Sequence, residues 1–367
     1  MIKKSVVAAL ASVTGCMAVN AHAQSSVTLF GMIDSGITYV SNHGGHSAWQ
    51  TDDGINGPNL WGLSGKEDLG GGTKAVFYLL SQFGLNNGSF LPGQSIFSRN
   101  AYVGLTNPQF GTLTLGNQYD FMSDALYSSG DDPAVYTGHL YGQGAGPFQK
   151  LALPSNPTGN FDWYRAAGRI ANSVKYNSPV FAGLSGGAMY GFGNVAGSMG
   201  TGDAMSFALS YANGPFGADA AYTYVKYPVT AGTIGPQVGV RNWGAGARYQ
   251  FGPVRVSGLF VTVKNMENRA SVYQGSAGAQ WFVRPDVALS ASYAYMKGNY
   301  VVDNNHAHQG AVTAEYFLSK RTSVYAMTVY QRANEGAHAL IMGFTGPTAA
   351  SSSATQWLGR VGLHVKF

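Results

Sequence analysis

Three short patterns in the 367-residue chain hold residue types that could do catalysis or bind a metal. Residues 183–187 (GLSGG) match G-x-S-x-G, the turn that presents a nucleophilic serine at a strand-to-helix junction in α/β-hydrolases. His43 with His46, and His306 with His308, are spaced so that each pair could share a metal ion. With 51 glycines a chance G-x-S-x-G match is expected, and neither histidine pair has further ligands nearby. We therefore expect no catalytic residue, no metal and no cofactor.

The composition predicts a membrane protein without membrane helices. Charged residues make up 11% of the chain, against about 25% in a typical soluble domain. Beyond residue 23, no uninterrupted apolar run reaches the roughly 18 residues that a spanning helix needs. A transmembrane antiparallel β-barrel reconciles the two facts, because its apolar residues alternate with polar ones. A net charge of only +5 and the lack of a basic cluster argue against nucleic acid as a partner.

The N-terminus has the pattern of a secretory signal peptide. Lys3 and Lys4 precede an apolar stretch over residues 6–19, which is followed by the A-x-A sequence of residues 21–23. This predicts cleavage after Ala23, export, and a mature chain of residues 24–367. The only cysteine, Cys16, would be lost with the signal, so the mature chain has no disulfide framework. Cys16 also fits a lipobox, an alternative that would leave a lipid-anchored protein.

Period-two alternation recurs along the mature chain, which indicates strands with one apolar and one polar face. It is clearest over residues 357–367 and recurs over 27–39, 243–251, 273–281 and 312–318. If the apolar face meets lipid, the other face is turned toward the barrel lumen. The charged residues that this rule places toward the lumen are Asp34, Arg248, Glu315 and Arg360.

Turn signals between the strand segments fall into two length classes. Short turns lie near residues 213–215, 251–253, 284–286 and 319–322. Long polar stretches are predicted as loops over residues 41–58, 194–203, 227–240, 298–308 and 336–354. Alternating short turns and long loops are the periplasmic and extracellular ends of an outer-membrane barrel. We expect a single barrel with no second domain.

One stretch, residues 120–164, is rich in Gly, Pro and Tyr and has no strand period. A loop of this length is usually functional or disordered. In a barrel it could fold into the lumen and narrow the pore.

The order of these segments resembles the Gram-negative general porins of β-proteobacteria, including those of Burkholderia and Neisseria. The resemblance implies a 16-stranded all-β barrel with an inward-folded third loop, assembled as a homotrimer in outer-membrane lipid and lipopolysaccharide. It also implies passive diffusion of small hydrophilic solutes and ions, and a role for the terminal Phe367 in outer-membrane sorting. The matching segments are residues 26–31 (SVTLFG), 61–70 (WGLSGKEDLG), 74–77 (KAVF), 101–105 (AYVGL), 110–116 (FGTLTLG), 172–176 (NSVKY), 318–322 (LSKRT) and Phe367.

The departures from the family pattern fall on expected pore-wall positions. Basic residues of such porins are replaced here by Leu60, Ser64 and Asn117. The usual Glu is replaced by Leu80, with Tyr78 two residues earlier, and alternation from Lys74 turns both toward the lumen. Much of the usual basic ladder is therefore missing.

Lys74, Arg169 and Lys175 remain as candidate wall cations, and Asp131 and Asp132 could supply opposing negative charge from the third loop. Opposed charges across a narrow constriction create a field that biases ion selectivity. In the alternative interpretation, Asp131 and Asp132 merely cap a turn. We expect a weakly ion-selective pore.

Three functions remain open. The first is a general diffusion porin. The second is a channel of the same fold that prefers aromatic or sugar-like solutes, favoured by Leu60, Tyr78, Leu80 and the loop tyrosines. The third is an outer-membrane barrel enzyme or adhesin, for which no converging catalytic group can be assembled from the sequence. The loop tyrosines are Tyr119, Tyr127, Tyr136 and Tyr141.

Overall fold

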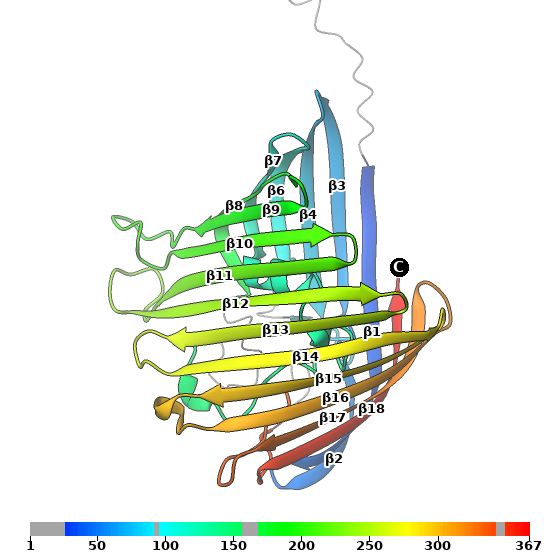
Figure 1. Ribbon diagram of the computed structural model, residues 1–367. Helices are drawn as coiled ribbons and strands as arrows, with labels where there is room; N and C mark the ends of the chain where they lie inside the picture. The colour runs from blue at the N-terminus through cyan, green and yellow to red at the C-terminus, as the bar shows by residue number, and fades with distance from the viewer. Residues whose placement is uncertain (1–25, 92–94, 156–167, 343–348) are drawn as a thin grey trace, which may run out of the picture.

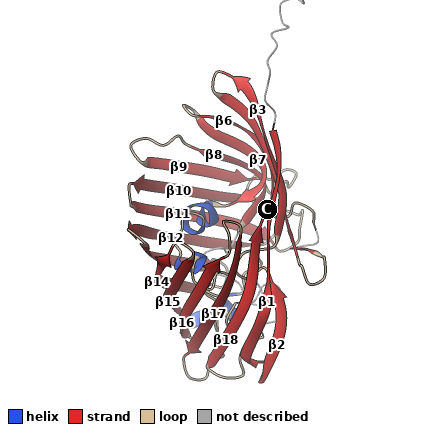
Figure 2. Cartoon of the chain, turned by 90° about the vertical axis from the view of Figure 1, so that its right-hand side faces the viewer, coloured by secondary structure: helices blue, strands red, loops and turns tan. Residues whose placement is uncertain are grey.

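The computed structural model describes residues 26–91, 95–155, 168–342 and 349–367 and is a closed antiparallel β-barrel (Figures 1 and 2). The predicted signal peptide lies outside the described residues. Of 18 strands in the sheet, β2 and β3 are two halves of one spanning strand, and β5 is a two-residue addition beside β4. The described residues therefore form a 16-stranded barrel, which confirms the predicted fold class.

Apart from the two-residue β5, the strands are 8–18 residues long, and the helical segments are short. No described helix is long and apolar enough to cross a membrane. The strands are β1 (Ser26–His43), β2 (His46–Asp53), β3 (Leu60–Gly70), β4 (Thr73–Phe83), β5 (Phe90–Leu91), β6 (Asn100–Asn107), β7 (Gly111–Tyr119), β8 (Arg169–Asn177), β9 (Leu184–Gly191), β10 (Ala204–Asn213), β11 (Phe216–Pro228), β12 (Gln237–Phe251), β13 (Val254–Asn265), β14 (Ser271–Arg284), β15 (Val287–Gly298), β16 (His306–Phe317), β17 (Thr322–Ala333) and β18 (Thr355–Lys366). The helical segments are η1 (Met122–Tyr127), η2 (Pro133–Val135), η3 (Gln149–Leu151) and η5 (Tyr300–Val302).

The alternation read from the sequence separates an outer from an inner face. In β18, Val361 is 58% exposed on the outer face, whereas Leu358 is fully buried on the inner face. The barrel closes where β18 pairs with β1, and Gly31 and Phe367 exchange two backbone hydrogen bonds of 3.1 and 3.0 Å. Closure leaves no sheet edge whose backbone groups would lie unpaired in lipid.

The two classes of connection are present, but one predicted loop is wrong. Residues 41–58 are not a single loop, because β1 continues to His43 and turns through Gly44 and Gly45 into β2. Only residues 54–59 leave the sheet, between β2 and β3. The polar inner face of a strand resembles a loop in composition, which explains the error.

The third loop, described over residues 120–155, folds into the barrel as predicted, with its short helical segments inside the ring of strands (Figure 2). It meets the inner wall one strand after another. The Tyr136 hydroxyl lies 2.6 Å from that of Ser257 on β13, and the Thr137 hydroxyl donates to Ser292 on β15 at 2.6 Å. The Gly138 amide then donates to Thr313 on β16 at 2.8 Å. Residues 156–164 of the predicted loop lie outside the described residues.

Two wall glycines let the loop approach this closely. A Cβ added at Gly246 would lie 2.6 Å from the Asp131 Cβ, and one added at Gly278 would lie 2.6 Å from the Pro133 Cβ. Real Cβ atoms do not approach so closely. The glycines on the inner face therefore leave the space in which the third loop packs.

The loop carboxylates Asp131 and Asp132 do not face the pore, so the prediction that they oppose wall cations is wrong. Asp131 is fully buried, and both Asp131 and Asp219 of β11 accept hydrogen bonds of 2.6 Å from Arg248 of β12. The buried Asp132 accepts a hydrogen bond from the Ala134 amide and caps η2. Both carboxylates hold the loop in place, because desolvated carboxylates require such partners.

A buried polar cluster joins the closure strands to the third loop. The Arg360 guanidinium of β18 is fully buried and forms ion pairs with Asp34 of β1 and Asp52 of β2. The Asp34 carboxylate also accepts hydrogen bonds from the amides of residues 55 and 56, and Tyr141 of the third loop donates to Asp52. One guanidinium thus holds β1, β2 and β18 together beneath residues 54–59.

Removing the Arg360 charge tests this cluster. We expect Arg360→Met to lower the free energy of unfolding by about 3–5 kcal/mol, because two buried carboxylates lose their counter-charge. The matched control is Arg284→Met, whose exposed pair with Asp286 is worth about 0–1 kcal/mol. Urea unfolding in detergent micelles, followed by tryptophan fluorescence, measures both. Equal effects of the two substitutions would contradict the role given to the cluster.

The Asp131 carboxyl makes docking of the third loop depend on pH. Burial raises the pKa of Asp131 to about 7, against 3.8 for an exposed carboxyl, although Arg248 opposes the rise. The docked loop therefore holds a proton that an undocked loop releases, so docking weakens as pH rises from about 4 to 7. We expect open-channel current noise to be greater at pH 8 than at pH 5. Asp131→Asn stays neutral and should remove this difference; a variant that keeps the wild-type pH dependence would show that another group is responsible.

Candidate functional site: the lumen constriction

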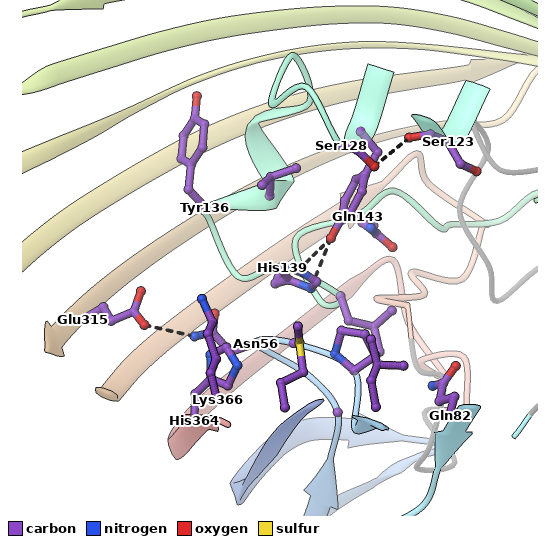
Figure 3. Close-up of a pocket in the computed structure, with 18 of the residues that line it drawn as sticks. Asn56, Gln82, Ser123, Ser128, Tyr136, His139, Gln143, Glu315, His364 and Lys366 are labelled. Atoms are coloured by element: carbon purple, nitrogen blue, oxygen red, sulfur yellow. Dashed lines mark hydrogen bonds between the residues drawn. The ribbon is translucent and has the colours of Figure 1, made fainter. Parts of the chain in front are cut away.

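The third loop and residues 54–59 narrow the lumen to a cavity of about 540 Å³. Figure 3 shows Tyr136, His139 and Gln143 of the loop on one side and Glu315, His364 and Lys366 of the wall on the other. Residues 54–59 reach the cavity because their backbone is held by Asp34 and by the loop, whose Leu140 amide donates to the Ile55 carbonyl at 3.1 Å. The described constriction is thus built from two segments that leave the regular sheet.

Five predicted wall residues share one face of the β3–β4 hairpin. Ser64 lies opposite Tyr78 in the antiparallel register, and Leu80 lies opposite Gly62. Directly opposed residues point to the same side of a sheet, and Leu60 on this side lines the cavity. Leu60 and Leu80 are nearly buried, whereas Lys74 is exposed near the short-turn end. The residues on this face are Leu60, Ser64, Lys74, Tyr78 and Leu80.

Tyr78 is the centre of an aromatic row on the inner face. Its ring stacks between Phe30 of β1 and Tyr102 of β6, with ring centroids 5.3 and 5.6 Å apart. Offset stacks of this kind add stabilisation beyond their buried area. Because Phe30 and Tyr102 cover the two faces of Tyr78, a planar solute could stack only at the ends of the row.

A group of basic and aromatic side chains lies on this wall, at the end away from Lys74. Arg99 donates to Tyr119 and, at 2.7 Å, to Gln82. The Arg169 guanidinium carbon lies 5.9 Å from the centre of the Tyr119 ring, within the range of a cation–π contact. All four side chains line the cavity, and Arg169 is therefore placed where it can act on permeating ions.

Two other residues predicted to line the pore wall do not face the pore. Asn117 lies opposite Ala101, on the outer face with Leu115, and its amide donates to the Ser98 carbonyl at 3.2 Å. Lys175 lies on the inner face but is buried, forming an ion pair with Asp124 and donating to the Tyr119 carbonyl at 2.8 Å. The first error is one of strand register, and the second arises because the loop covers the lysine.

Of the charged residues that alternation assigned to the lumen, some are buried in ion pairs and one lines the cavity. Asp34 and Arg360 are buried in the polar cluster, and Arg248 bridges Asp131 and Asp219. Glu315 lines the cavity and accepts hydrogen bonds from Ser323 at 2.5 Å and from Asn56 at 3.5 Å. Only Glu315 of these four is in the cavity lining.

The sequence interpretation missed three basic residues of the cavity: Arg99, Arg255 and Lys366. Alternation places Arg255 inward between the outward Val254 and Val256, so the same period-two rule could have found it. Arg99 lies just before β6, outside any strand period, and no local signal identifies it.

The catalysis-like patterns have no structural support among the described residues. Ser185 lies within β9, which pairs with β10 over its whole length, and not in a strand-to-helix turn. The part of the chain that the structure describes contains no group of three or more His, Cys, Asp or Glu residues able to hold a metal ion.

Comparison with known proteins agrees with the barrel geometry. A family model described as Gram-negative porin matches residues 6–336. The chain is 29% identical over 342 residues to outer membrane porin protein 32 of Delftia acidovorans, covering 88% of each chain. It is also 29% identical over 284 residues to an outer membrane porin protein of Bordetella pertussis, covering 70% of this chain and 68% of the relative.

The solved structure of an anion-selective porin from Comamonas acidovorans has the same barrel, with a TM-score of 0.77 and 25% identity. The alignment covers 94% of this chain and all of the other. Porins are channels and not enzymes, which confirms the predicted absence of catalytic function. With a closed barrel, an inward third loop and a family match over most of its length, the chain belongs to the Gram-negative porin family and is an outer-membrane channel.

Proposed function

We propose that this porin forms a water-filled channel with a weak preference for small hydrophilic anions. The observation that carries the proposal is the charge of the cavity lining. Four basic side chains line the cavity, namely Arg99, Arg169, Arg255 and Lys366, against a single acidic one, Glu315. Basic groups lining a narrow aqueous constriction favour anions.

Four other inward carboxylates lie outside the cavity lining. Asp34 and Asp52 share the single charge of Arg360, and Asp131 and Asp219 share that of Arg248, all within buried or half-buried contacts. Buried ion pairs contribute little field to the water-filled part of the pore. The structurally similar Comamonas porin, described as anion-selective, supports the same sign of preference.

A second candidate function is a preference for aromatic or sugar-like solutes. The row of Phe30, Tyr78 and Tyr102 presents stacked rings on the inner wall, and Tyr119 lies between two arginines. Planar solutes stack on such rings, and sugars present apolar faces to them. In this case the channel has a saturable subsite, whereas a general porin does not.

The remaining assignments rest on the sequence and the family. Residues 1–23 act as a signal peptide cleaved after Ala23, residues 24–367 form the single barrel, and Phe367 contributes to sorting. The barrels assemble as homotrimers in contact with outer-membrane lipid and lipopolysaccharide, as the family resemblance implies. The intact mass of the protein from outer membranes tests the cleavage site, since a chain that retains residues 1–23 or carries lipid on Cys16 would refute it.

Two single substitutions of opposite sign test the ion preference. At about 8 Å in water one unit charge contributes about 0.5 kcal/mol, roughly a twofold change in ion permeability. Because the charge acts with opposite sign on anions and cations, Arg255→Gln should lower the anion-to-cation permeability ratio about fourfold, and Glu315→Gln should raise it by a similar factor. Reversal potentials in a tenfold KCl gradient measure both. Shifts of the same sign in the two variants would contradict the proposed lining.

Solute block separates the two candidate functions. If the aromatic row is a subsite, an aryl glycoside should reduce the current of wild-type channels in a saturable way. Tyr78→Leu, which keeps an apolar residue of similar reach, should abolish the block and leave the ion preference unchanged. Recordings in planar bilayers also count the conductance steps per insertion, and three equal steps are expected of a trimer. Absence of block in the wild type would leave the general porin as the function.

A further inference from the structure

Two phenylalanines of the inner wall meet inside the lumen, near the short-turn end of the barrel. Phe282 of β14 and Phe317 of β16 both line the cavity, and their ring centroids lie 6.2 Å apart with the ring planes inclined by 23°. The strand between them, β15, carries the small Ala288 opposite Phe282, and Ala288 is buried. The two rings therefore meet above Ala288. We call Phe282 and Phe317 the lumen phenylalanine pair.

The lumen phenylalanine pair keeps apolar surface in contact with the water of the pore. Phe282 is 37% exposed although it is on the inner face of β14. In the part of the chain that the structure describes, each ring of the pair stacks on one other ring, whereas Tyr78 is stacked on both faces. Apolar surface in water is unfavourable, and a bound apolar group removes it from water. An aromatic group therefore gains free energy by binding to the pair.

A cation without a partner lies beside the pair on β13. Arg255 lies directly opposite Gln280 of β14, and Phe282 is two residues further along the same face of that strand. Such diagonal neighbours lie about 7–8 Å apart, which is within reach of long side chains. Among the described residues, Arg255 forms no ion pair and no side-chain hydrogen bond. Its guanidinium is therefore free to receive a carboxylate close to the pair.

The other charged residues near the pair are a lysine and a glutamate. Lys366 of β18 lines the cavity and, within the described ranges, forms no ion pair and no side-chain hydrogen bond. Glu315, two residues before Phe317 on β16, already accepts hydrogen bonds from Ser323 and Asn56. Two unpaired cations against one hydrogen-bonded carboxylate make this part of the lumen more favourable for an anion than for a cation.

We infer that the lumen phenylalanine pair and Arg255 form a subsite for aryl carboxylates. The ring of the solute rests on Phe282 and Phe317, and its carboxylate pairs with the Arg255 guanidinium. Aromatic rings favour offset or edge-to-face contacts with one another, and the planar guanidinium matches the two oxygens of a carboxylate. A ring joined to a carboxylate by a short linker fits the diagonal from Phe282 to Arg255.

The inference deepens the proposed anion preference and rests on it, because an aryl carboxylate reaches the subsite only through a lumen that admits anions. It concerns a different wall from the row of Phe30, Tyr78 and Tyr102, which lies on β1, β4 and β6. It also names a different class of solute, because the row has no unpaired cation assigned to it.

The test is block of single-channel current by phenylpropionate, with the purified full-length porin in planar bilayers and KCl on both sides. The wild-type channel should show block that saturates with concentration. Propionate lacks the ring and phenylpropanol lacks the charge, so each should bind on the order of tenfold or more weakly than phenylpropionate. Equal affinity for either of these two solutes would overturn the inference.

The free amino acid phenylalanine adds an ammonium group to the carbon frame of phenylpropionate. Since the pair is flanked by two unpaired cations, the amino acid should bind more weakly than phenylpropionate. Tighter binding of the amino acid would show that Glu315 recognises the ammonium group, and would overturn the choice of an aryl anion.

Substitutions separate the ring contact from the charge. Phe282→Leu with Phe317→Leu keeps apolar side chains of similar reach and should weaken phenylpropionate binding on the order of tenfold. Arg255→Gln should weaken it by a similar factor, on the order of tenfold. The matched control for the charge is Lys74→Gln, an exposed cation near the short-turn end of β4 that does not line the cavity. An equal loss in Lys74→Gln would overturn the assignment of Arg255.

Two further readouts separate this inference from both candidate functions. Tyr78→Leu should bind phenylpropionate like wild type, and a loss there would move the subsite to the aromatic row and overturn the inference. The double leucine variant should keep the wild-type reversal potential in a KCl gradient, because no charge is changed. Anion preference without saturable block in the wild type would overturn the subsite and leave the proposed ion preference standing.

Discussion

Closure of the backbone hydrogen-bond ladder is the constraint on which the rest of this structure depends. A membrane offers no water to unpaired backbone groups, so the first strand must find the last one. Here β1 pairs with β18 on one side and with both β2 and β3 on the other. The gap between β2 and β3 is the one place in the described barrel where a spanning strand is interrupted, and the buried Arg360 cluster compensates there.

The third loop turns a wide barrel into a narrow channel because the wall is shaped to receive it. Glycines on the inner face leave room for the loop backbone, and hydroxyl groups on successive strands hydrogen-bond to it. Arg248 and Lys175 of the wall then pair with the loop carboxyl groups of Asp131 and Asp124. The charged residues that attach the loop do not line the cavity. A small set of basic residues and Glu315 line it instead.

The two sides of the wall meet different partners. Inside, the basic residues of the cavity lining meet water and permeating solutes, where a few charges are enough to bias passage. Outside, the exposed side chains of the strands are largely apolar and aromatic, as the lipid-facing band of such a barrel requires. The same period-two rule thus separates solute contacts from lipid contacts within one strand.

The sequence by itself determined the fold class, because period-two alternation, missing membrane helices and two lengths of connection admit only a barrel in a membrane. It also determined that Tyr78 and Leu80 share a face with Lys74, since alternation is a local property. Tertiary structure alone decided which inward charges remain available to solutes. Asp131, Asp132 and Lys175 are buried by a loop that docks on strands far away in sequence, and Arg99 reaches the lumen from outside any strand. The burial and ion pairing of these side chains depend on long-range contacts, and such contacts produce no periodic pattern in the sequence.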